Sequence, residues 1–513
     1  MFPGTWAQQT PDKPALVIAE TGETTTYAQL DERSLRLAHV FADAGLTTGD
    51  VVAMVSDNAP QAYEVYWAAL RSGLYVTAVN HHLSPDEAAY IVNDCGAKAM
   101  VVSAAKSDLV SAIADLVDVP VRLAFGGEVP GCSSYDEALA ATSTEPLAEQ
   151  PHGDDFLYSS GTTGRPKGIK LPLLPIQVDE PGYPYVMIFG ALFSYGPDTV
   201  YLSPAPVYHA APLRYTGVIQ ALGGTVVLMQ RFDPENFLRA VQEHHVTDTQ
   251  CVPTMLVRML KLPEEVRTSY DTSSLKTVVH AAAPCPVEVK QQMMDWLGPI
   301  VHEYYASTEA NGATYVGPED WLLHPGTVGK SLLGTPRVCG PDGRELAAGE
   351  VGTIYFERDE EPFTYHGDPD KTASTRHPQH PLWSTVGDLG YVDADGYLFL
   401  TDRKAFMIIS GGVNIYPQEI EDLFSLHPAV LDIAVIGVPD DDMGERVVAF
   451  VEPTEEGSAH PDLAADLTSY ARERIAHFKV PREFVVTDDL PRTPTGKLVK
   501  QKLRDRYAEE AIA

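Results

Sequence analysis

The sequence predicts an α/β protein with a large N-terminal domain of mainly parallel, helix-covered sheets, a small β-rich subdomain and a small α+β C-terminal domain. Its 513 residues exceed one hydrophobic core, because single cores stop growing near about 250–300 residues. In the first third, apolar runs of strand length alternate with segments of helical periodicity, the order that gives parallel sheets covered by helices. Hydrophobic residues are 44% and charged residues 21% of the chain, so burial can outweigh chain entropy.

The first elements follow one another as helix, strand, helix and strand. Apolar residues recur at helical spacing over 30–44, and VVAMV at 51–55 reads as a buried strand. A cap-like Ser-Asp-Asn at 56–58 precedes an apolar helix over 61–71, and the next strand begins at Leu74. This is the length that a βαβ unit requires. Because the pattern recurs further along, we expect ligands near the C-terminal ends of the strands.

The later part of the chain changes character. Residues 335–356 form turn-rich short strands, which predicts a β-rich subdomain over about 330–400. Beyond it, helices and strands alternate in a segment of about 110 residues, a normal domain length. We therefore expect an N-terminal domain over 1–402 and a C-terminal domain over 403–513.

Charge and cysteine usage exclude several classes of protein. Lys and Arg number 37 against 71 Asp and Glu, a formal net charge of −34, which argues against binding nucleic acid or anionic lipid. A local basic pocket for a small anion remains compatible with this balance. The five cysteines are scattered and never form a CxxC pair, which suits a reducing cytosol. No signal peptide pattern and no run of 18 apolar residues occurs, so we expect a cytoplasmic protein with no membrane span.

The most informative segment is 158–168, Tyr-Ser-Ser-Gly-Thr-Thr-Gly-Arg-Pro-Lys-Gly. Glycines let backbone N–H groups approach an anion, hydroxyls donate hydrogen bonds and lysine supplies charge, so the composition suits a polyphosphate. The spacing differs from a Walker A loop, which needs four residues between its glycines and then Lys-Ser/Thr. From composition alone, a flexible surface turn is the alternative.

The segment resembles the hallmark loop of the acyl-adenylate-forming (AMP-binding) superfamily, Y-[ST]-S-G-T-T-G-x-P-K-G, and matches it throughout. The resemblance covers nearly the whole chain, because further segments similar to family motifs follow in the expected order. These are Pro206–His209 for the acyl pocket, Tyr305–Glu309 for the adenylate, Trp383–Asp388 for the ribose, Asp402–Arg403, Ser410–Gly412 and Asn414–Pro417 for the interdomain junction, and Pro494–Lys497 for the C-terminal lysine.

The resemblance implies an ATP- and Mg²⁺-dependent acid–CoA ligase, that is, an AMP-forming acyl-CoA synthetase. Such an enzyme transfers AMP to a carboxylic acid, here a fatty or aromatic one, releases pyrophosphate and passes the acyl group to coenzyme A. The implied partners are small molecules, with a homodimer also allowed for. Two alternatives stay open: a ligase that uses an amine or a carrier-protein thiol as acceptor, and a nucleotide-binding pseudo-enzyme.

The resemblance also implies roles for individual residues. Lys497 would stabilise charge as acyl-AMP forms, Thr308 would donate to the α-phosphate and Glu309 would bind Mg²⁺. The implied ATP- and AMP-binding residues are Ser159, Ser160, Gly161, Thr162, Thr163, Gly164, Lys167, Glu303, Tyr304, Tyr305, Asp388 and Arg403. The implied acyl pocket contains His209, His280, Ala281, Ala282 and Ala283. The implied coenzyme A residues are Ser410, Gly411, Gly412 and Phe478.

Each role has a plainer alternative. Thr308 and Glu309 could cap a helix start, Tyr305 and Phe478 could pack in a core, Asp388 could be a turn residue, and His209 could be a structural histidine. The sequence also departs from the family at the implied hinge, where Ala405 and Phe406 replace charged residues, so the efficiency of thioester formation is open. In the family the C-terminal domain is mobile and rotates about this hinge between the two half-reactions.

Overall fold

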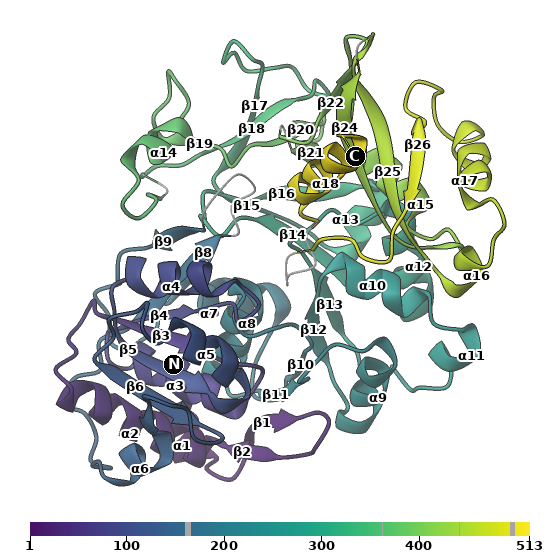
Figure 1. Cartoon of the computed structure of the whole chain (residues 1–513). Coiled ribbons are helices and arrows are strands. Elements are labelled where there is room, and N and C mark those ends of the chain that lie inside the picture. Colours follow the sequence, from purple (N-terminus) through teal and green to yellow (C-terminus); the bar gives the residue numbers. More distant parts are fainter. Residues whose placement is uncertain (160–165, 362, 404, 441, 493–497, 513) are drawn as a thin grey trace. The chain divides into compact units, whose positions relative to one another are not determined.

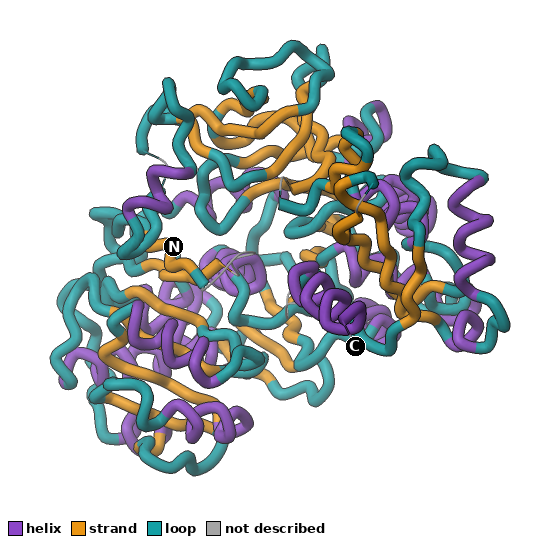
Figure 2. The backbone as a smooth tube through the Cα atoms, turned by 45° about the horizontal axis from the view of Figure 1, so that its top comes forward, coloured by secondary structure: helices purple, strands orange, loops and turns teal. Residues whose placement is uncertain are grey.

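The computed structural model describes residues 1–159, 166–361, 363–403, 405–440, 442–492 and 498–512. The chain forms two compact units (Figure 1). Unit 1 contains Met1–Cys251, Glu264–Val278 and Phe363–Pro369; unit 2 contains Val252–Pro263, Val279–Pro362 and Asp370–Ala513. Figure 2 shows helices in purple beside the orange strands of each unit. Among the described residues, no helix combines the length and the apolar character needed to cross a membrane.

A seven-stranded sheet in unit 1 runs in the order β7-β6-β5-β3-β4-β8-β9 and is parallel except for β9. Every residue of β3 is buried, as expected for a strand covered on both faces. Alternate β3 residues pack with α4 and α5 in one hydrophobic core. The strands are β3 (Val51–Val55), β4 (Tyr75–Ala78), β5 (Ala97–Ser103), β6 (Val121–Phe125), β7 (Ser133–Ser134), β8 (Asp154–Ser159) and β9 (Lys167–Lys170).

A second group of strands in unit 1 has the order β12-β10-β11-β1-β2, with only β2 antiparallel to its neighbour. The strands are β1 (Pro14–Ile18), β2 (Thr24–Thr26), β10 (Val200–Ser203), β11 (Thr225–Leu228) and β12 (Asp248–Cys251); β13 (Thr277–His280) begins in unit 1 and ends in unit 2. The helical elements of unit 1 are α1 (Pro3–Gln9), α2 (Tyr27–Asp43), α3 (Pro60–Leu70), α4 (Pro85–Asp94), the 3₁₀ turn η1 (Ala104–Lys106), α5 (Ser107–Ile113), α6 (Tyr135–Ala140), α7 (Pro184–Phe193), α8 (Ala210–Ala221), α9 (Pro234–His244) and α11 (Glu264–Arg267).

The prediction that residues 56–58 cap the next helix is wrong. α3 begins at Pro60, and its N-cap Ala59 makes no side-chain cap bond. Proline has no N–H to leave unpaired at the first helical position, and its fixed φ suits the start of a helix without a side-chain cap. The Asn58 side chain instead bonds the backbone of distant loops, donating to Ala205 O and Met229 O and accepting from Val207 N.

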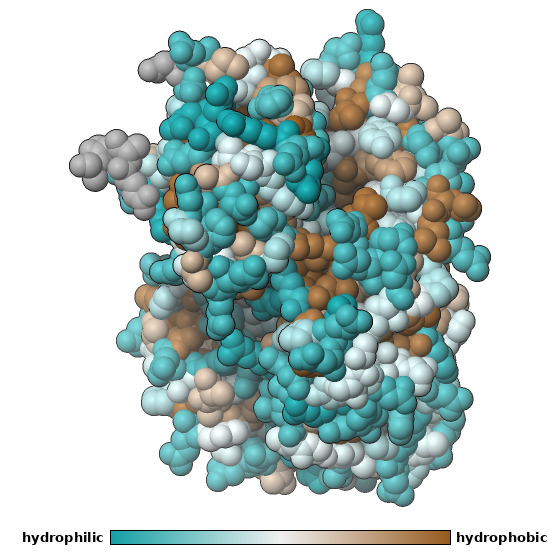
Figure 3. Space-filling model, turned by 90° about the vertical axis from the view of Figure 1, so that its right-hand side faces the viewer, coloured by the Kyte–Doolittle hydropathy of each residue, from teal (hydrophilic) through white to brown (hydrophobic). Residues whose placement is uncertain are grey.

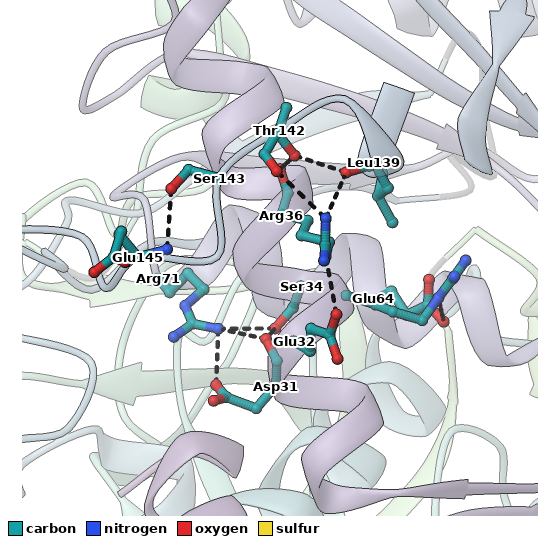
Figure 4. Close-up of polar contacts among 11 residues, drawn as sticks. Asp31, Glu32, Ser34, Arg36, Glu64, Arg71, Leu139, Thr142, Ser143 and Glu145 are labelled. Atoms are coloured by element: carbon teal, nitrogen blue, oxygen red, sulfur yellow. Dashed lines mark hydrogen bonds and ion pairs between the residues drawn. The ribbon is translucent and has the colours of Figure 1, made fainter. Parts of the chain in front are cut away.

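Buried ion pairs hold α2 to α3 in unit 1 (Figure 4). The guanidinium of Arg71, on the turn after α3, donates to Asp31 Oδ1 over 2.9 Å and to Ser34 Oγ over 3.0 Å. On the next turns of α2, Arg36 donates to the carbonyl oxygens of Leu139 and Thr142, at the end of α6. These bonds tie α2 to the turn that follows α6.

An antiparallel array in unit 2 has the strand order β14-β15-β16-β21-β20-β18-β17, with β19 paired to β18. Its strands are β14 (Val301–Ala306), β15 (Ala313–Val316), β16 (Thr327–Leu333), β17 (Thr335–Cys339), β18 (Gly352–Glu357), β19 (Trp383–Ser384), β20 (Asp388–Val392) and β21 (Leu398–Arg403). The helices that accompany them are α10 (Pro253–Leu260), α12 (Val287–Leu297), α13 (Pro318–Leu323) and α14 (Pro369–Ser374).

The C-terminal part of unit 2 is an α+β arrangement. Its sheet has the order β23-β22-β25-β24, with β26 parallel to β25. One face of the long β24–β25 pair packs with α15 and α17, and the other packs with α18. The elements are β22 (Ile408–Ser410), β23 (Val413–Ile415), α15 (Pro417–Phe424), β24 (Val430–Asp440), β25 (Gly444–Pro453), α16 (Glu455–Ser458), α17 (Leu463–Arg472), β26 (Glu483–Val486) and α18 (Lys500–Ile512). Hydrophilic residues predominate on the face drawn in Figure 3, in keeping with the acid-rich composition.

Candidate functional site

The predicted phosphate loop connects β8 to β9 in unit 1. These strands are antiparallel, and Ser159 and Lys167 are opposite each other at the last pair before the loop. The hairpin therefore places a hydroxyl residue and a cationic residue at the two ends of the loop. Ser160, Gly161, Thr162, Thr163 and Gly164 lie outside the described residues, so their part in phosphate binding stays a prediction.

Residues from much later in the chain complete the base of this hairpin. Tyr365 pairs with Ile169 in an antiparallel bridge, and His366 N donates to Gly168 O over 2.9 Å. The Lys167 ammonium lies 5.3 Å from the centroid of the Tyr365 ring, within the range of a cation–π contact. Gly168 has to be glycine, because a Cβ there would lie 2.7 Å from the ring of Phe156.

The predicted adenylate and ribose residues come together in unit 2. Asp388 begins β20, and its register partner on β21 is Arg403. Arg403 Nε lies 3.0 Å from Asp388 Oδ1. Tyr305, on β14, donates from its hydroxyl to Asp388 Oδ2 over 2.5 Å. The structure thus joins three residues that stand up to 98 positions apart in the sequence (403 − 305).

The electrostatics of this cluster favour a charged guanidinium on Arg403. Burial disfavours the charged form of Arg403, but attraction by Asp388, Tyr305 and Glu309 outweighs it and raises the pKa of the guanidinium. Burial and the adjacent Asp388 carboxylate raise the pKa of Tyr305, so its hydroxyl stays a donor. The Arg403 side chain is 39% exposed and Asp388 is 9% exposed, so a ligand can reach the guanidinium from solvent.

Thr308 and Glu309 lie on a turn between β14 and β15, and no helix begins there. The helix-cap alternative for these two residues therefore does not apply. Ala310 has a left-handed φ of 51°, and its N–H donates to Ser307 O over 3.1 Å. Arg358 donates to Ala310 O over 3.0 Å, which fixes the turn from the other side.

Glu309 has the chemistry of a Mg²⁺ ligand. Its side chain belongs to a residue that is only 8% exposed, and its charge acts on Arg403. A carboxylate oxygen is the donor type that this hard cation prefers. The residues present thus fit the ion, and the assignment of Glu309 stays a prediction.

Glu303 belongs to a buried ion cluster that the sequence did not reveal. Lys290 of α12 lies 2.8 Å from Glu303 Oε2 and His280 Nε2 lies 3.3 Å from the same oxygen. Lys290 was not among the predicted residues. The sequence did indicate that Lys290 is buried, because it shares helical spacing with Met293 and Met294 on the buried face of α12. A lysine at such a position requires a charged partner. Tyr304, the next predicted residue, is half-buried and pairs with Tyr315 across the strands.

The other predicted acyl-pocket residues are split between the units. His209 is the N-cap residue of α8 in unit 1, and its ring centroid lies 4.4 Å from that of Tyr208. Ala281, Ala282 and Ala283 follow His280 directly in unit 2. Ala281 is buried, whereas Ala282 is exposed and has a φ of 76°. No described contact tests their role in acyl binding.

The predicted coenzyme A segment forms a tight hairpin turn. Ser410 pairs with Val413, and Gly411 and Gly412 between them have φ values of 58° and 79°. A two-residue turn with both φ values positive favours glycine, so the turn itself accounts for both glycines. Phe478 is 51% exposed, which excludes core packing as the reason for its position.

The predicted hinge residue Ala405 lies exposed in the turn that follows β21. The next residue closes this turn, because Phe406 N donates to Arg403 O over 2.9 Å. The position of Ala405 suits a hinge, but rotation there stays a prediction. Lys497 lies outside the described residues.

Comparison with known proteins identifies the family. The AMP-binding enzyme model matches residues 4–360, and the AMP-binding enzyme C-terminal domain model matches residues 419–497. The chain therefore belongs to the AMP-binding enzyme family, and the predictions of the superfamily and of an enzyme are confirmed.

Two curated relatives match over almost the whole chain. The feruloyl-CoA synthase of an Amycolatopsis species is 33% identical over 501 residues, covering 96% of this chain and 96% of the relative. The long-chain-fatty-acid–CoA ligase FadD13 of Mycobacterium tuberculosis is 29% identical over 507 residues, covering 98% and 97%.

Solved structures confirm the predicted fold class. ATP-bound MatB from Rhodopseudomonas palustris superposes with a TM-score of 0.80 at 29% identity, covering 99% of each chain. The amide bond synthetase McbA from Marinactinospora thermotolerans superposes with a TM-score of 0.80 at 25% identity, covering 98% of this chain and 99% of that one.

Proposed function

We propose that this protein is an ATP- and Mg²⁺-dependent acid–CoA ligase that activates a fatty or aromatic acid as acyl-AMP and transfers the acyl group to coenzyme A. The observation that carries the proposal is the Tyr305–Asp388–Arg403 cluster. It presents a carboxylate, a guanidinium and an aromatic ring together, beside the turn that carries Glu309. A ribose needs hydrogen-bond acceptors and donors, and adenine needs a flat apolar surface, so this set suits adenosine.

Adenylation needs stabilisation of the charge that moves onto pyrophosphate. In our proposal Ser159 and Lys167, at the ends of the β8–β9 loop, meet the terminal phosphates of ATP, and Thr308 donates to the α-phosphate. Asp388 accepts hydrogen bonds from the ribose hydroxyls while Arg403 holds the carboxylate in place. Lys497 supplies positive charge as the mixed anhydride forms.

Magnesium would be held by Glu309 together with phosphate oxygens of the nucleotide. When bound, the ion would neutralise phosphate charge and so lower the barrier to displacement of pyrophosphate.

The acyl group would lie near α7 and α8. Tyr215 of α8 lies among aromatic rings, stacked at 4.6 Å on Phe189 and 6.0 Å from Tyr201 between centroids. Tyr201 and Tyr215 are fully buried and Phe189 is half-buried, so Phe189 offers the apolar contact that favours an apolar acid over a charged one. The names of two relatives, one for long-chain fatty acids and one for feruloyl, are in line with this choice.

A second candidate differs only in the acceptor. The likeness to McbA, an amide bond synthetase, favours an amine as the nucleophile that attacks acyl-AMP. Ala405 and Phe406 replace charged residues at the hinge. This change would reduce activity less in an enzyme that does not rotate its C-terminal domain to bring in a thiol acceptor.

One experiment separates the candidates. Purified protein is incubated with ATP, Mg²⁺ and a panel of fatty and aromatic acids, with coenzyme A, with amines or with neither, and pyrophosphate and acyl products are measured by mass detection. Acyl-CoA in the presence of coenzyme A is the expected result. Pyrophosphate release with amide but no thioester would favour the second candidate. No pyrophosphate with any acid would refute both.

A further inference from the structure

Three elements of unit 2 meet at one buried carboxylate oxygen. His280 is the last residue of β13, Lys290 lies on α12 and Glu303 lies on β14. Lys290 Nζ is 2.8 Å and His280 Nε2 is 3.3 Å from Glu303 Oε2. His280 and Lys290 have no exposed surface, and Glu303 is 6% exposed. The contact thus closes a strand–helix–strand segment on itself, away from solvent.

The charges in this cluster balance. Burial would raise the pKa of Glu303, but the adjacent His280 and Lys290 side chains outweigh it and lower that pKa. Burial lowers the pKa of His280, which favours a neutral imidazole, and its Nε2 lies 3.3 Å from the carboxylate. The Lys290 ammonium also lies 4.9 Å from the centroid of the Trp321 ring. Burial lowers the pKa of Lys290, while Glu303 acts in the opposite direction and favours the ammonium.

Stability alone does not require this arrangement. Replacing a buried ion pair by uncharged residues of similar size is often neutral or stabilising, whereas removing one partner costs about 3–5 kcal/mol. A buried pair can instead fix one geometry among several. The Lys290–Glu303 pair therefore suits a role in holding β13, α12 and β14 in one arrangement.

Both candidate ligand-facing segments of unit 2 begin at this cluster. Ala281–Ala283 follow His280 directly, and Tyr304 and Tyr305 follow Glu303. Along a strand, residues i and i+2 point to the same face, so Glu303 and Tyr305 share a face of β14. A displacement of Glu303 would therefore be passed to Tyr305, whose hydroxyl binds Asp388.

We propose that Lys290, Glu303 and His280 form a positioning triad that sets the separation between residues 281–283 and Tyr305, and through it the affinity for the nucleotide. The proposal rests on the proposed function, because it takes Tyr305 as part of the adenosine site. The triad touches no reacting atom. Its loss should weaken binding of ground state and transition state equally, which raises KM and leaves kcat nearly unchanged.

The test uses a variant that should fold but lacks the Lys290–Glu303 ion pair. The double variant Lys290→Met/Glu303→Gln removes both charges and keeps an acceptor for His280, so its melting temperature should stay within ~4 °C of wild type. Its AMP affinity, measured by calorimetry, should fall about tenfold, less than the ~10²-fold that a 1 Å misplacement can cost. KM for ATP should rise by the same factor, with kcat for adenylation within about threefold. Glu288→Gln, an exposed carboxylate on α12, is the control and should change none of these.

If the double variant does not fold, a second pair of variants tests the positioning triad. His280→Ala removes the imidazole that lies against Glu303 but leaves Lys290 to pair with it, and His280→Gln keeps a polar side chain of similar reach there. AMP affinity should fall in His280→Ala and return in His280→Gln. Wild-type affinity in the folded double variant, or in His280→Ala, would overturn the proposal. AMP affinity is read without turnover, so an absence of pyrophosphate release in the wild type would refute the proposed function and leave this comparison intact.

Discussion

Replacing Asp388 by Asn should show whether Asp388 binds the ribose or only forms a structural ion pair with Arg403. Asn keeps the size of the side chain but removes the charge that lies 3.0 Å from Arg403 Nε and accepts from the Tyr305 hydroxyl over 2.5 Å. The new amide group must turn its NH₂ toward Arg403 or toward the ligand. A hydrogen bond to a charged group contributes about 1.5–3 kcal/mol, and each 1.36 kcal/mol is tenfold in rate. The loss in kcat/KM for ATP should therefore be about 10- to 150-fold.

Tyr305→Phe is the matched comparison. It removes the hydroxyl but leaves the ring and the Asp388–Arg403 pair, so the loss in kcat/KM for ATP should be smaller than in Asp388→Asn, because the hydroxyl contacts the carboxylate and not the ribose. Both variants are measured by ATP–pyrophosphate exchange at varied ATP, with thermal melting to verify the fold. Equal losses in the two variants, or an unchanged ATP dependence in Asp388→Asn, would refute the assignment of the ribose to this carboxylate.

Three further predictions test the other implied roles. Lys167→Ala should raise KM for ATP in the exchange assay; an unchanged ATP dependence would show that its ammonium does not meet the phosphates. Glu309→Gln should lower activity and shift the Mg²⁺ titration to higher concentration, and an unshifted titration would remove Glu309 as the ligand. Lys497→Ala should lose acyl-AMP synthesis by ~10²–10³ yet still convert preformed acyl-AMP and coenzyme A to the thioester. Ala405→Pro should keep acyl-AMP synthesis and slow thioester formation, because proline fixes φ at the hinge. Equal loss of both steps in both variants would argue against domain rotation.

The regular elements were predictable because each carries its own pattern. VVAMV is apolar at every position and becomes the fully buried strand β3, and the helical spacing around Leu30 and Phe41 becomes α2. That Tyr305, Asp388 and Arg403 lie together was predictable through the family motifs that hold them. Spacing alone would not have joined them, since they are far apart in the sequence.

What the sequence did not reveal depends on contacts between distant segments. Asn58 looked like a helix cap because its neighbours are polar, yet its amide bonds two loops that lie more than a hundred residues away. For Lys290, helical spacing with Met293 and Met294 indicated burial but not the partner. Its burial follows from Glu303, thirteen residues further on, and one sequence does not report which carboxylate a lysine meets.

Strand β9, which follows the predicted phosphate loop, has a consequence for synthesis of the chain on the ribosome. β9 gains its second neighbour from Tyr365 and His366, and the core around Ile169 contains Phe363 and Tyr365. Translation proceeds at about 5–20 residues per second, so roughly 10–40 s pass between the emergence of β9 and the arrival of these residues. Until then the open edge of β9 exposes unpaired backbone groups of the kind that promote wrong pairing. We therefore expect the nascent chain to need protection at this edge, and a fragment ending at Cys251 to aggregate where the full chain does not.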